Sequence, residues 1–305
     1  MNKLIKQAFT LIELLVVIAI ISILSGLIVV SMSGVTQKAN IAKAQVFSNS
    51  LRNSLMMNIV SEWKFEEGSG QDVIDSWGRV SSCTLGSSTE VDINDPTRTT
   101  LGCVYGNCLS FDGSDDYVDC GNQEVLKALS RANQDSSWSY WFKTSTGGEV
   151  IGKYQPFQFI VSATSGKLSS FIYNGSSHLI GSPWQGDSIV NDDKWHYVVF
   201  AVDRSGYFFV YLDGVIEGSP CNISSHAGEN WAETANLYIG VRNPGSSPFS
   251  GLVDDIRIYN AVILTSQIKE QYYTGLNNLF TNSIISKEEY INRVDEMISI
   301  AAEGK

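Results

Sequence analysis

The sequence predicts a mainly β protein: an antiparallel β-sandwich head on a long N-terminal α-helix, with short helices at the C-terminus. Three observations predict this class. Residues 14–37 carry no charged side chain. From about Ser61 to Asn260, short stretches of alternating apolar residues are separated by clusters of Gly, Ser, Asp and Asn, a spacing typical of antiparallel sandwiches. Beyond Thr265, apolar residues return at helical spacing.

The composition supports two parts. A chain of 305 residues is long enough for one globular domain with an attached segment. Aromatic residues make up 11% and charged residues 17%, and together with frequent glycine this balance suits a turn-rich β domain. The net charge of −11 argues against nucleic acid as a partner, because the phosphate backbone attracts basic surfaces.

The sequence of the N-terminal segment predicts that it crosses the membrane once. The uncharged run exceeds the roughly 20 residues that cross a bilayer, and we place the span at about 14–35. Lys3 and Lys6 precede it without an acid, which keeps the N-terminus in the cytoplasm and puts everything after Val35 outside. A secretory signal peptide has a shorter apolar core and a small-x-small cleavage site, and no such ending occurs before Ser31. We therefore expect a single-pass protein of the cytoplasmic (inner) membrane with an extracytoplasmic head.

One acid, Glu13, lies within the apolar run, where a charge needs a partner or a function. Residues 6–13, KQAFTLIE, resemble the class III signal of type IV pilins and of the pseudopilins of type II secretion. The resemblance implies a leader, residues 1–8, which a prepilin peptidase removes between Ala8 and Phe9, and methylation of the new Phe9 amine. It also implies that Glu13 meets the N-terminal amine of a neighbouring pilin or pseudopilin subunit during assembly. Ala8 stands where the family usually has glycine.

The helix is predicted to continue past the membrane and to cover residues 9–60. No proline occurs before Pro96, and residues 36–60 keep apolar side chains at helical spacing as far as Ile59. The outer half of this helix would support the head.

Five blocks of the head occur in the order of one family. They are WKFEEGSGQDVIDSWG, LSFDGSDDYVDCG, WSYWFKTS, KWHYVVFAVDRSGYFFVYLDGV and FSGLVDDIRIYNAVILTSQI. They resemble the laminin-G-like, concanavalin A-like jelly-roll domain, and we assign residues 61–264 to it. The resemblance implies a binding domain for carbohydrate or protein ligands, although glycosidases share the fold. Within it, Asp213 and Gly214 are predicted to form a hairpin turn.

Five cysteines follow the apolar segment, and none is paired with histidine at zinc-ligand spacing. Outside the cytoplasm, cysteines favour disulfides. We predict a bond between Cys103 and Cys108, because the glycine between them lets the chain fold back within bridging distance. The odd number leaves one thiol free, buried or used between chains, and the other pairings stay open.

Two tryptophans are the candidates for ligand contact. A sugar requires an exposed aromatic ring flanked by polar groups. Trp184 and Trp231 lie in the polar stretches GSPWQGDS and AGENWAET rather than in alternating strands. Both are therefore predicted to be exposed.

Calcium is the candidate cofactor, because jelly-roll domains of the kind that the head resembles often hold one, with carboxylates and backbone carbonyls as ligands. The resemblance makes the first and last blocks adjacent strands. It thereby implies that four acids converge near one edge of the sandwich: Glu67, Asp72, Asp254 and Asp255. Solvated acids at strand ends are the alternative.

No enzymatic activity is expected. A glycosidase needs two carboxylates at a defined separation. The stretch EVDIND, residues 90–95, resembles the catalytic strand Glu-x-Asp-x-x-Glu of laminarinase-like glucanases, but Asp95 replaces the last glutamate and Pro96 follows. None of the three histidines lies in a nucleophile-elbow context, and His196, in a strand block, is interpreted as a packed β residue.

The tail, residues 265–305, predicts two helices. Thr265 is expected to cap a short helix through Tyr273, with Gly275 as its stop. Ser286 and Glu289 form a capping-box pattern for the second helix.

The sequence as a whole predicts a pilin-like surface protein, either a minor pilin or a pilus-associated adhesin, that displays a binding head. A head of about 200 residues is bulky for a filament made only of itself. A pseudopilin of a type II secretion system and a membrane-tethered glycan hydrolase are the alternatives.

Overall fold

The computed structural model describes residues 18, 57–180, 183–231 and 234–302. The chain forms two compact units, Met1–Ser54 and Leu55–Lys305, and the second, the head, holds nearly all of the described residues. Three residues predicted to act in processing and assembly, Ala8, Phe9 and Glu13, lie outside the described residues, as does the predicted span apart from Ile18. Among the described residues, no helix is both long enough and apolar enough to cross a membrane.

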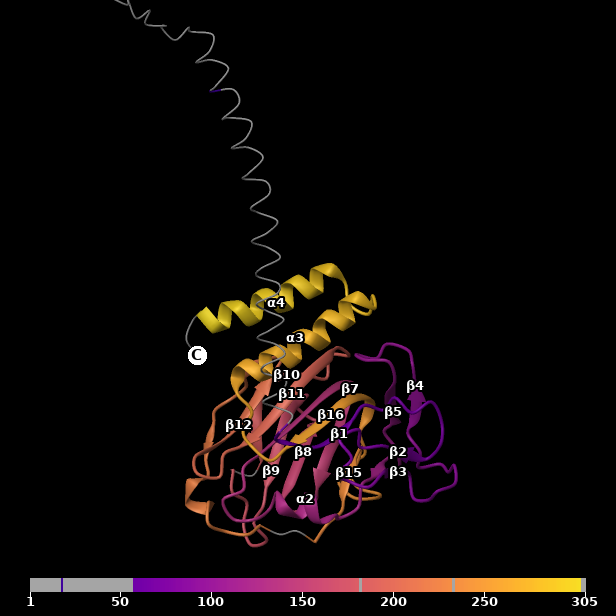
Figure 1. Cartoon of the computed structure of the whole chain (residues 1–305), viewed down its shortest axis with the longest axis vertical. Coiled ribbons are helices and arrows are strands. Elements are labelled where there is room, and N and C mark those ends of the chain that lie inside the picture. The colour runs from indigo at the N-terminus through magenta and orange to yellow at the C-terminus, as the bar shows by residue number, and fades with distance from the viewer. Residues whose placement is uncertain (1–17, 19–56, 181–182, 232–233, 303–305) are drawn as a thin grey trace, which may run out of the picture. The chain divides into compact units, whose positions relative to one another are not determined.

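Two antiparallel sheets form the head, as predicted (Figure 1). Sheet A contains β1 (Ile59–Trp63), β4 (Thr97–Thr99), β5 (Cys108–Asp112), β11 (Trp195–Val202), β12 (Tyr207–Leu212), β13 (Val215–Ile216), β14 (Cys221–Asn222) and β16 (Ser250–Tyr259). Sheet B contains β2 (Asp72–Val73), β3 (Cys83–Leu85), β6 (Val118–Asp119), β8 (Phe157–Val161), β9 (Lys167–Ile172), β10 (Trp184–Ile189) and β15 (Leu237–Ile239). A short helix, α2 (Glu124–Ala128), and a 3₁₀ turn, η1 (Ser224–His226), lie in the connections.

Strand β7 (Ser136–Lys153) belongs to both sheets. It changes sheets at Gly147 and Gly148, which have φ of +135° and +126°. A Cβ at Gly148 would lie 2.2 Å from the carbonyl oxygen of Pro248, so only glycine fits there. The glycine pair thus lets a single strand pass from sheet A into sheet B.

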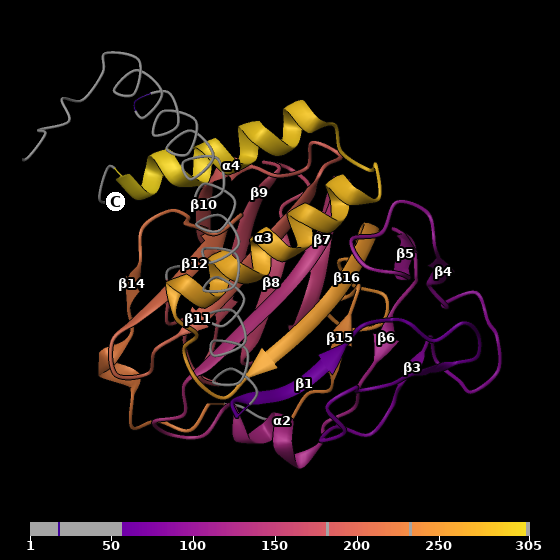
Figure 2. The same ribbon diagram turned by 45° about the horizontal axis from the view of Figure 1, so that its top comes forward.

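The core has two layers. Between the sheets, aromatic rings stack, with the centroids of Phe159 and Phe200 4.2 Å apart. On the other face of sheet A, α3 (Thr265–Thr281) buries Tyr272 against Trp141, and α4 (Lys287–Ala302) packs beside α3 (Figure 2). The C-terminal helices therefore complete the head.

The predicted end of the long helix is wrong, because Met57 and Asn58 lie in a turn and β1 follows at once. The long helix was expected to extend to residue 60, but Ile59 and Val60 lie in β1. Ile59 pairs with Tyr259 of β16 and is 7% exposed. Burial against sheet A therefore outweighs the helical spacing at this end.

Helix α3 begins at Thr265, but its N-cap is Leu264 rather than the predicted Thr265, and the helix does not end near Gly275. It runs on to Thr281, and Gly275 packs inside the head. A Cβ on Gly275 would lie 2.2 Å from the ring of Trp141. This glycine therefore marks a close approach of helix and sheet rather than a stop. Ser286 caps α4 as predicted, with its Oγ accepting from the Glu289 amide at 3.0 Å.

The structure contains the predicted disulfide between Cys103 and Cys108. A second bond joins Cys83 of β3 to Cys120, which directly follows β6. Cys221 is free and partly buried, and burial raises the pKa of its thiol. One unpaired thiol was predicted from the odd count.

Candidate functional site

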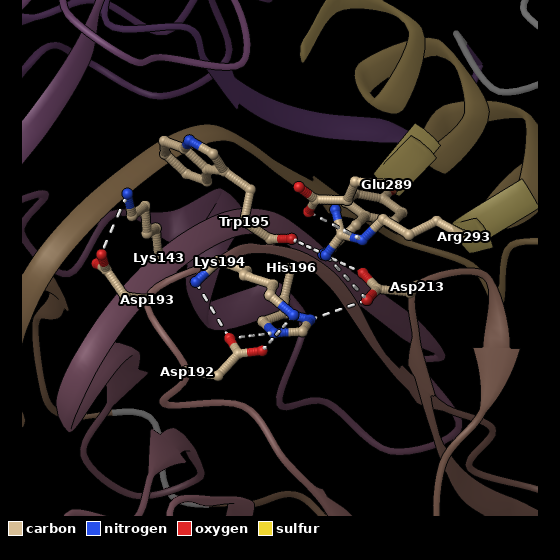
Figure 3. A network of polar contacts seen from close by, with 10 residues as sticks. Lys143, Asp192, Asp193, Lys194, Trp195, His196, Asp213, Glu289 and Arg293 are labelled. Atoms are coloured by element: carbon tan, nitrogen blue, oxygen red, sulfur yellow. Dashed lines mark hydrogen bonds and ion pairs between the residues drawn. The ribbon is translucent and has the colours of Figure 1, made fainter. Parts of the chain in front are cut away.

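Polar side chains line two of the clefts on the described part of the head. The first, which we call the α4 cleft, has a volume of about 540 Å³ and lies between α4 and the ends of β10, β11 and β12. His196, Asp192, Asp213 and Arg293 line it (Figure 3).

His196 is the centre of the α4 cleft. Its Nδ1 lies 2.8 Å from Asp213 Oδ2, and its Nε2 lies 3.1 Å from Asp192 Oδ1. Burial opposes a charge on the imidazole, but the two carboxylates outweigh it and raise the pKa of His196 to about 9. The histidine is buried, as its strand context predicted, at 8% exposed. The ion pairs were not predicted, although an aspartate four residues earlier and the Asp213-Gly214 hairpin were visible in the sequence.

Arg293 joins α4 to this centre. Its Nη2 donates to the carbonyl of Trp195 at 2.5 Å and lies 3.7 Å from Asp213 Oδ2 (Figure 3). Asp213 also accepts from the amide of Tyr197 at 2.8 Å. Both ring nitrogens of His196 are already engaged, so this histidine has no free nitrogen for proton transfer. The effect of these ion pairs and hydrogen bonds is to hold α4 against the sandwich.

The second cleft, which we call the tyrosine cleft, has a volume of about 490 Å³. It lies where β15 and the loop after it meet the turn between β7 and β8. Its lining residues are Tyr154, Ala235, Asn236, Tyr238, Arg242, Asn243 and Ser246.

Strand register places the two tyrosines at this cleft. Tyr238 pairs with Gly152 of β7, a position with no side chain, and Tyr154 follows two residues later in the turn and is 42% exposed. Asn236 donates through Nδ2 to both Asp119 oxygens, at 3.1 and 3.2 Å, and to the Tyr238 hydroxyl at 3.4 Å. The cleft therefore presents aromatic rings whose surroundings are fixed by hydrogen bonds.

Arg242 supplies the charge in the tyrosine cleft. Its Nε donates to Glu149 Oε2 at 3.1 Å, and its side chain is 30% exposed. The Glu149 side chain is fully buried, and burial raises its pKa to about 8, although Arg242 opposes the shift. Rings, amides and one guanidinium together are suited to a polar ligand with a flat apolar face.

The prediction that Trp184 and Trp231 are exposed is wrong. Trp184 is 5% exposed, because it is the first inward residue of β10, and its Nε1 donates to the Ser219 carbonyl at 2.9 Å. Trp231 is 2% exposed, and the Arg204 guanidinium lies 3.5 Å from its ring centroid. Neither ring is open to a sugar.

The four acids predicted to hold calcium do not converge. Three of them have separate protein partners: Glu67 pairs with Arg98 at 3.0 Å, Asp254 accepts from the Tyr105 amide at 2.9 Å, and Asp255 pairs with Arg257 at 3.0 Å. Asp72 is exposed on β2, in the other sheet from β16. Burial raises the pKa of Asp254 well above its usual range.

Within the described ranges, the one group of three acids close enough to share an ion is Asp112, Asp115 and Asp116. The group shapes its own turn: Asp116 accepts from the Asp112 amide at 2.8 Å, and Asp112 accepts from the Ser114 amide at 2.7 Å. The carboxylates of residues 92 and 95 are likewise engaged within their own loop, before β4.

The head is an antiparallel sandwich of the jelly-roll type. The particular family follows from the sequence: residues 112–269, more than half of the chain, match the concanavalin A-like lectin/glucanases superfamily, and the chain belongs to this family. Residues 5–29 match the prokaryotic N-terminal methylation motif. Both matches agree with the resemblances stated above. Comparison with curated proteins finds no match.

Solved structures share the fold of the head. Domain 4 of AbnA, an extracellular arabinanase from Geobacillus stearothermophilus, in complex with arabinotriose, is 21% identical, with a TM-score of 0.50 over 70% of this chain and 97% of that domain. The ligand-binding domain of botulinum neurotoxin serotype D, in complex with N-acetylneuraminic acid, is 14% identical, with a TM-score of 0.54 over 74% of this chain and 53% of that one. The binding domain of Paraclostridial Mosquitocidal Protein 1 is 10% identical, with a TM-score of 0.55 over 73% and 53% of the two chains.

Proposed function

We propose that this chain is a pilin-like surface protein, a minor pilin or a pilus-associated adhesin, whose head binds a carbohydrate in the tyrosine cleft. The observation that carries the proposal is the union of a methylation motif with a lectin-like head that has a cleft of tyrosines and amides. After removal of the leader, the N-terminal helix anchors the chain in the cytoplasmic membrane and then joins other pilin subunits at the cell surface.

The chemistry of the cleft supports a saccharide ligand. Tyrosine rings pack on the apolar face of a sugar ring, while amides and a guanidinium bind its hydroxyls. The complexes with arabinotriose and N-acetylneuraminic acid place saccharides on this fold. A related toxin domain binds synaptotagmin II, so the test must include protein ligands.

Assembly is tested with Glu13→Ala in cells that make the whole chain. If Glu13 neutralises the N-terminal amine of a neighbouring subunit, the variant should be missing from surface filaments. The amine would then remain an unpaired charge in the apolar interior of the filament. Immunogold counts per filament measure this, with Thr10→Ala as the control. Normal counts in the Glu13→Ala variant would contradict the assembly role.

Binding is tested on an array of glycans and matrix proteins, with and without EDTA. Tyr238→Ala should weaken glycan binding by roughly tenfold, because a ring in the cleft is lost. Tyr207→Ala removes a tyrosine that is 43% exposed on β12 and should have no effect. Equal binding by both variants would remove the tyrosine cleft from the proposal, and turnover of a β-glucan would favour the tethered hydrolase. Loss of binding in EDTA would show that calcium is needed.

A further inference from the structure

Among the residues that the structure describes, Arg242 is the one cation that lines the tyrosine cleft. Only its Nε is engaged, by Glu149, and within the described part of the chain its two Nη atoms have no hydrogen-bond partner. The Nη edge of a guanidinium is a planar pair of donors that matches the two oxygens of a carboxylate. The tyrosine cleft therefore contains a pair of guanidinium donors, the two Nη groups of Arg242, beside its tyrosines.

Glu149 does not neutralise this cation at neutral pH. Its side chain is fully buried, and its Oε1 has no partner among the described residues. Burial raises its pKa to about 8, so the carboxyl is mostly protonated below that pH. Within the part of the chain that the structure describes, no ionised carboxylate then offsets the charge of Arg242.

The other charged groups near the cleft are already engaged. On β6, Asp119 accepts from Asn236. On β7, the buried Lys153 donates to Asn122 at 2.5 Å and also to the carbonyl of Ala235. Tyr140, on the same strand, has a pKa raised by burial and then by Glu149. Among these groups only Arg242 offers free charged donors to a ligand.

We propose that the tyrosine cleft binds an acidic saccharide, whose carboxylate accepts hydrogen bonds from the Nη edge of Arg242 while Tyr154 and Tyr238 contact its sugar ring. This inference rests on the proposed function and narrows it to one class of glycan. Glu149 holds the guanidinium from inside, through Nε, so that the outer edge faces the ligand.

The test uses the full chain in detergent micelles and two matched pairs of probes. The pairs are sialyllactose with lactose, and trigalacturonate with its carboxyl-reduced trisaccharide. We expect at least one acidic probe to bind roughly tenfold or more tightly than its neutral partner, the ratio set by charge-assisted hydrogen bonds. Arg242→Gln should abolish that ratio, and Arg242→Lys should restore only part of it. Arg79→Gln, at an exposed site, should change nothing.

The pH dependence supplies a second measurement. Above pH 8 the ionised Glu149 offsets part of the positive charge of Arg242, so acidic-probe binding should weaken between pH 7 and 9. Glu149→Gln should bind the acidic probe with no such fall. Thermal unfolding of each variant confirms that it is folded.

The possible outcomes separate the two proposals. Equal binding of acidic and neutral probes, or an acidic preference that survives in folded Arg242→Gln, overturns this inference and leaves the glycan-binding proposal standing. No binding of any glycan, here or on the array, overturns both.

Discussion

His196 illustrates how a buried histidine can be structural rather than catalytic. Each ring nitrogen faces a carboxylate, Asp213 at 2.8 Å and Asp192 at 3.1 Å. A general base needs one nitrogen free to reach a substrate proton. The imidazolium here instead balances the acids beside Arg293, so α4 is held by charge as well as by apolar contact.

The stability of the head should depend on His196 above neutral pH. Its pKa is about 9 in the fold against an ordinary 6.5, so its contribution is full below about pH 6.5 and is lost as pH rises through 9. The difference in midpoint temperature between wild type and His196→Gln should therefore shrink from pH 6 to pH 10. Circular dichroism measures it.

Glu149 also lowers the stability of the head as pH rises toward 8. Because Glu149 is present in both wild type and His196→Gln, its effect cancels in the difference between their midpoint temperatures. His178→Gln, at an exposed histidine, is the control and should follow the wild type at every pH. A constant difference between wild type and His196→Gln would contradict the role given to the ion pairs.

Whether a given tryptophan is buried or exposed could not be predicted from the local sequence. Trp184 and Trp231 stand in polar stretches, but what covers them is distant: the Ser219 carbonyl and Phe208 for one, Arg204 and Phe157 for the other. Composition describes the neighbours along the chain, while burial depends on neighbours in space. The disulfide at Cys103 was predictable because both partners are local.

At the scale of elements, α3 shows sterics overriding propensity. Alanine is a better helix former than glycine by about 1 kcal/mol. At Gly275, however, a Cβ would lie 2.2 Å from the Trp141 ring, which is fully buried. Glycine is therefore the residue that lets this helix lie flat on sheet A.

Gly275→Ala should accordingly destabilise the head despite the gain in helix propensity. We expect a loss of about 1–3 kcal/mol in the free energy of unfolding, the range for overpacking a filled core. Urea denaturation followed by tryptophan fluorescence measures it. Gly228→Ala, where a Cβ meets nothing within 4 Å, is the matched control. A stabilised Gly275→Ala variant would show that the helix can shift away from Trp141.

Elements with a strong local pattern were predictable. Alternating apolar residues predicted β11 and β12, and the Asp213-Gly214 pair predicted the hairpin turn that follows β12. The capping pattern at Ser286 predicted the start of α4. The end of the long helix was not predictable, because Ile59 fits a helical stripe and a buried strand equally well.

At the scale of the whole molecule, two disulfides restrict the unfolded chain to different degrees. Cys83 and Cys120 are 37 residues apart, and Cys103 and Cys108 are 5 apart. In the loop-entropy account, closing the longer loop stabilises a fold by about 4 kcal/mol and the shorter by about 2 kcal/mol.

Removing the longer link should therefore cost more. The Cys83→Ala, Cys120→Ala double variant should lose roughly 2 kcal/mol more than the Cys103→Ala, Cys108→Ala variant. Guanidinium unfolding of the two proteins measures the gap, and Cys221→Ala serves as the control at the free thiol. Equal losses would mean that packing around the sulfurs, rather than loop closure, sets the stability.

The tyrosine cleft was beyond sequence reasoning for a global reason. Tyr154 and Arg242 are far apart in the chain, and only the pairing of β7 with β15 brings their segments together. The sandwich itself was predictable from alternation and block order, because these depend on local pattern. The site depends on register, which one sequence does not reveal.

The sandwich begins and ends at neighbouring points. The amide of Asn260 donates to the carbonyl of Asn58 at 2.9 Å, just outside the paired strands β1 and β16. A domain whose ends meet can be moved between host proteins with little disturbance to the host. Exchange of the sandwich at these two asparagines therefore offers a route to give one N-terminal helix a different specificity, as long as the new sandwich keeps a face of sheet A on which α3 can pack.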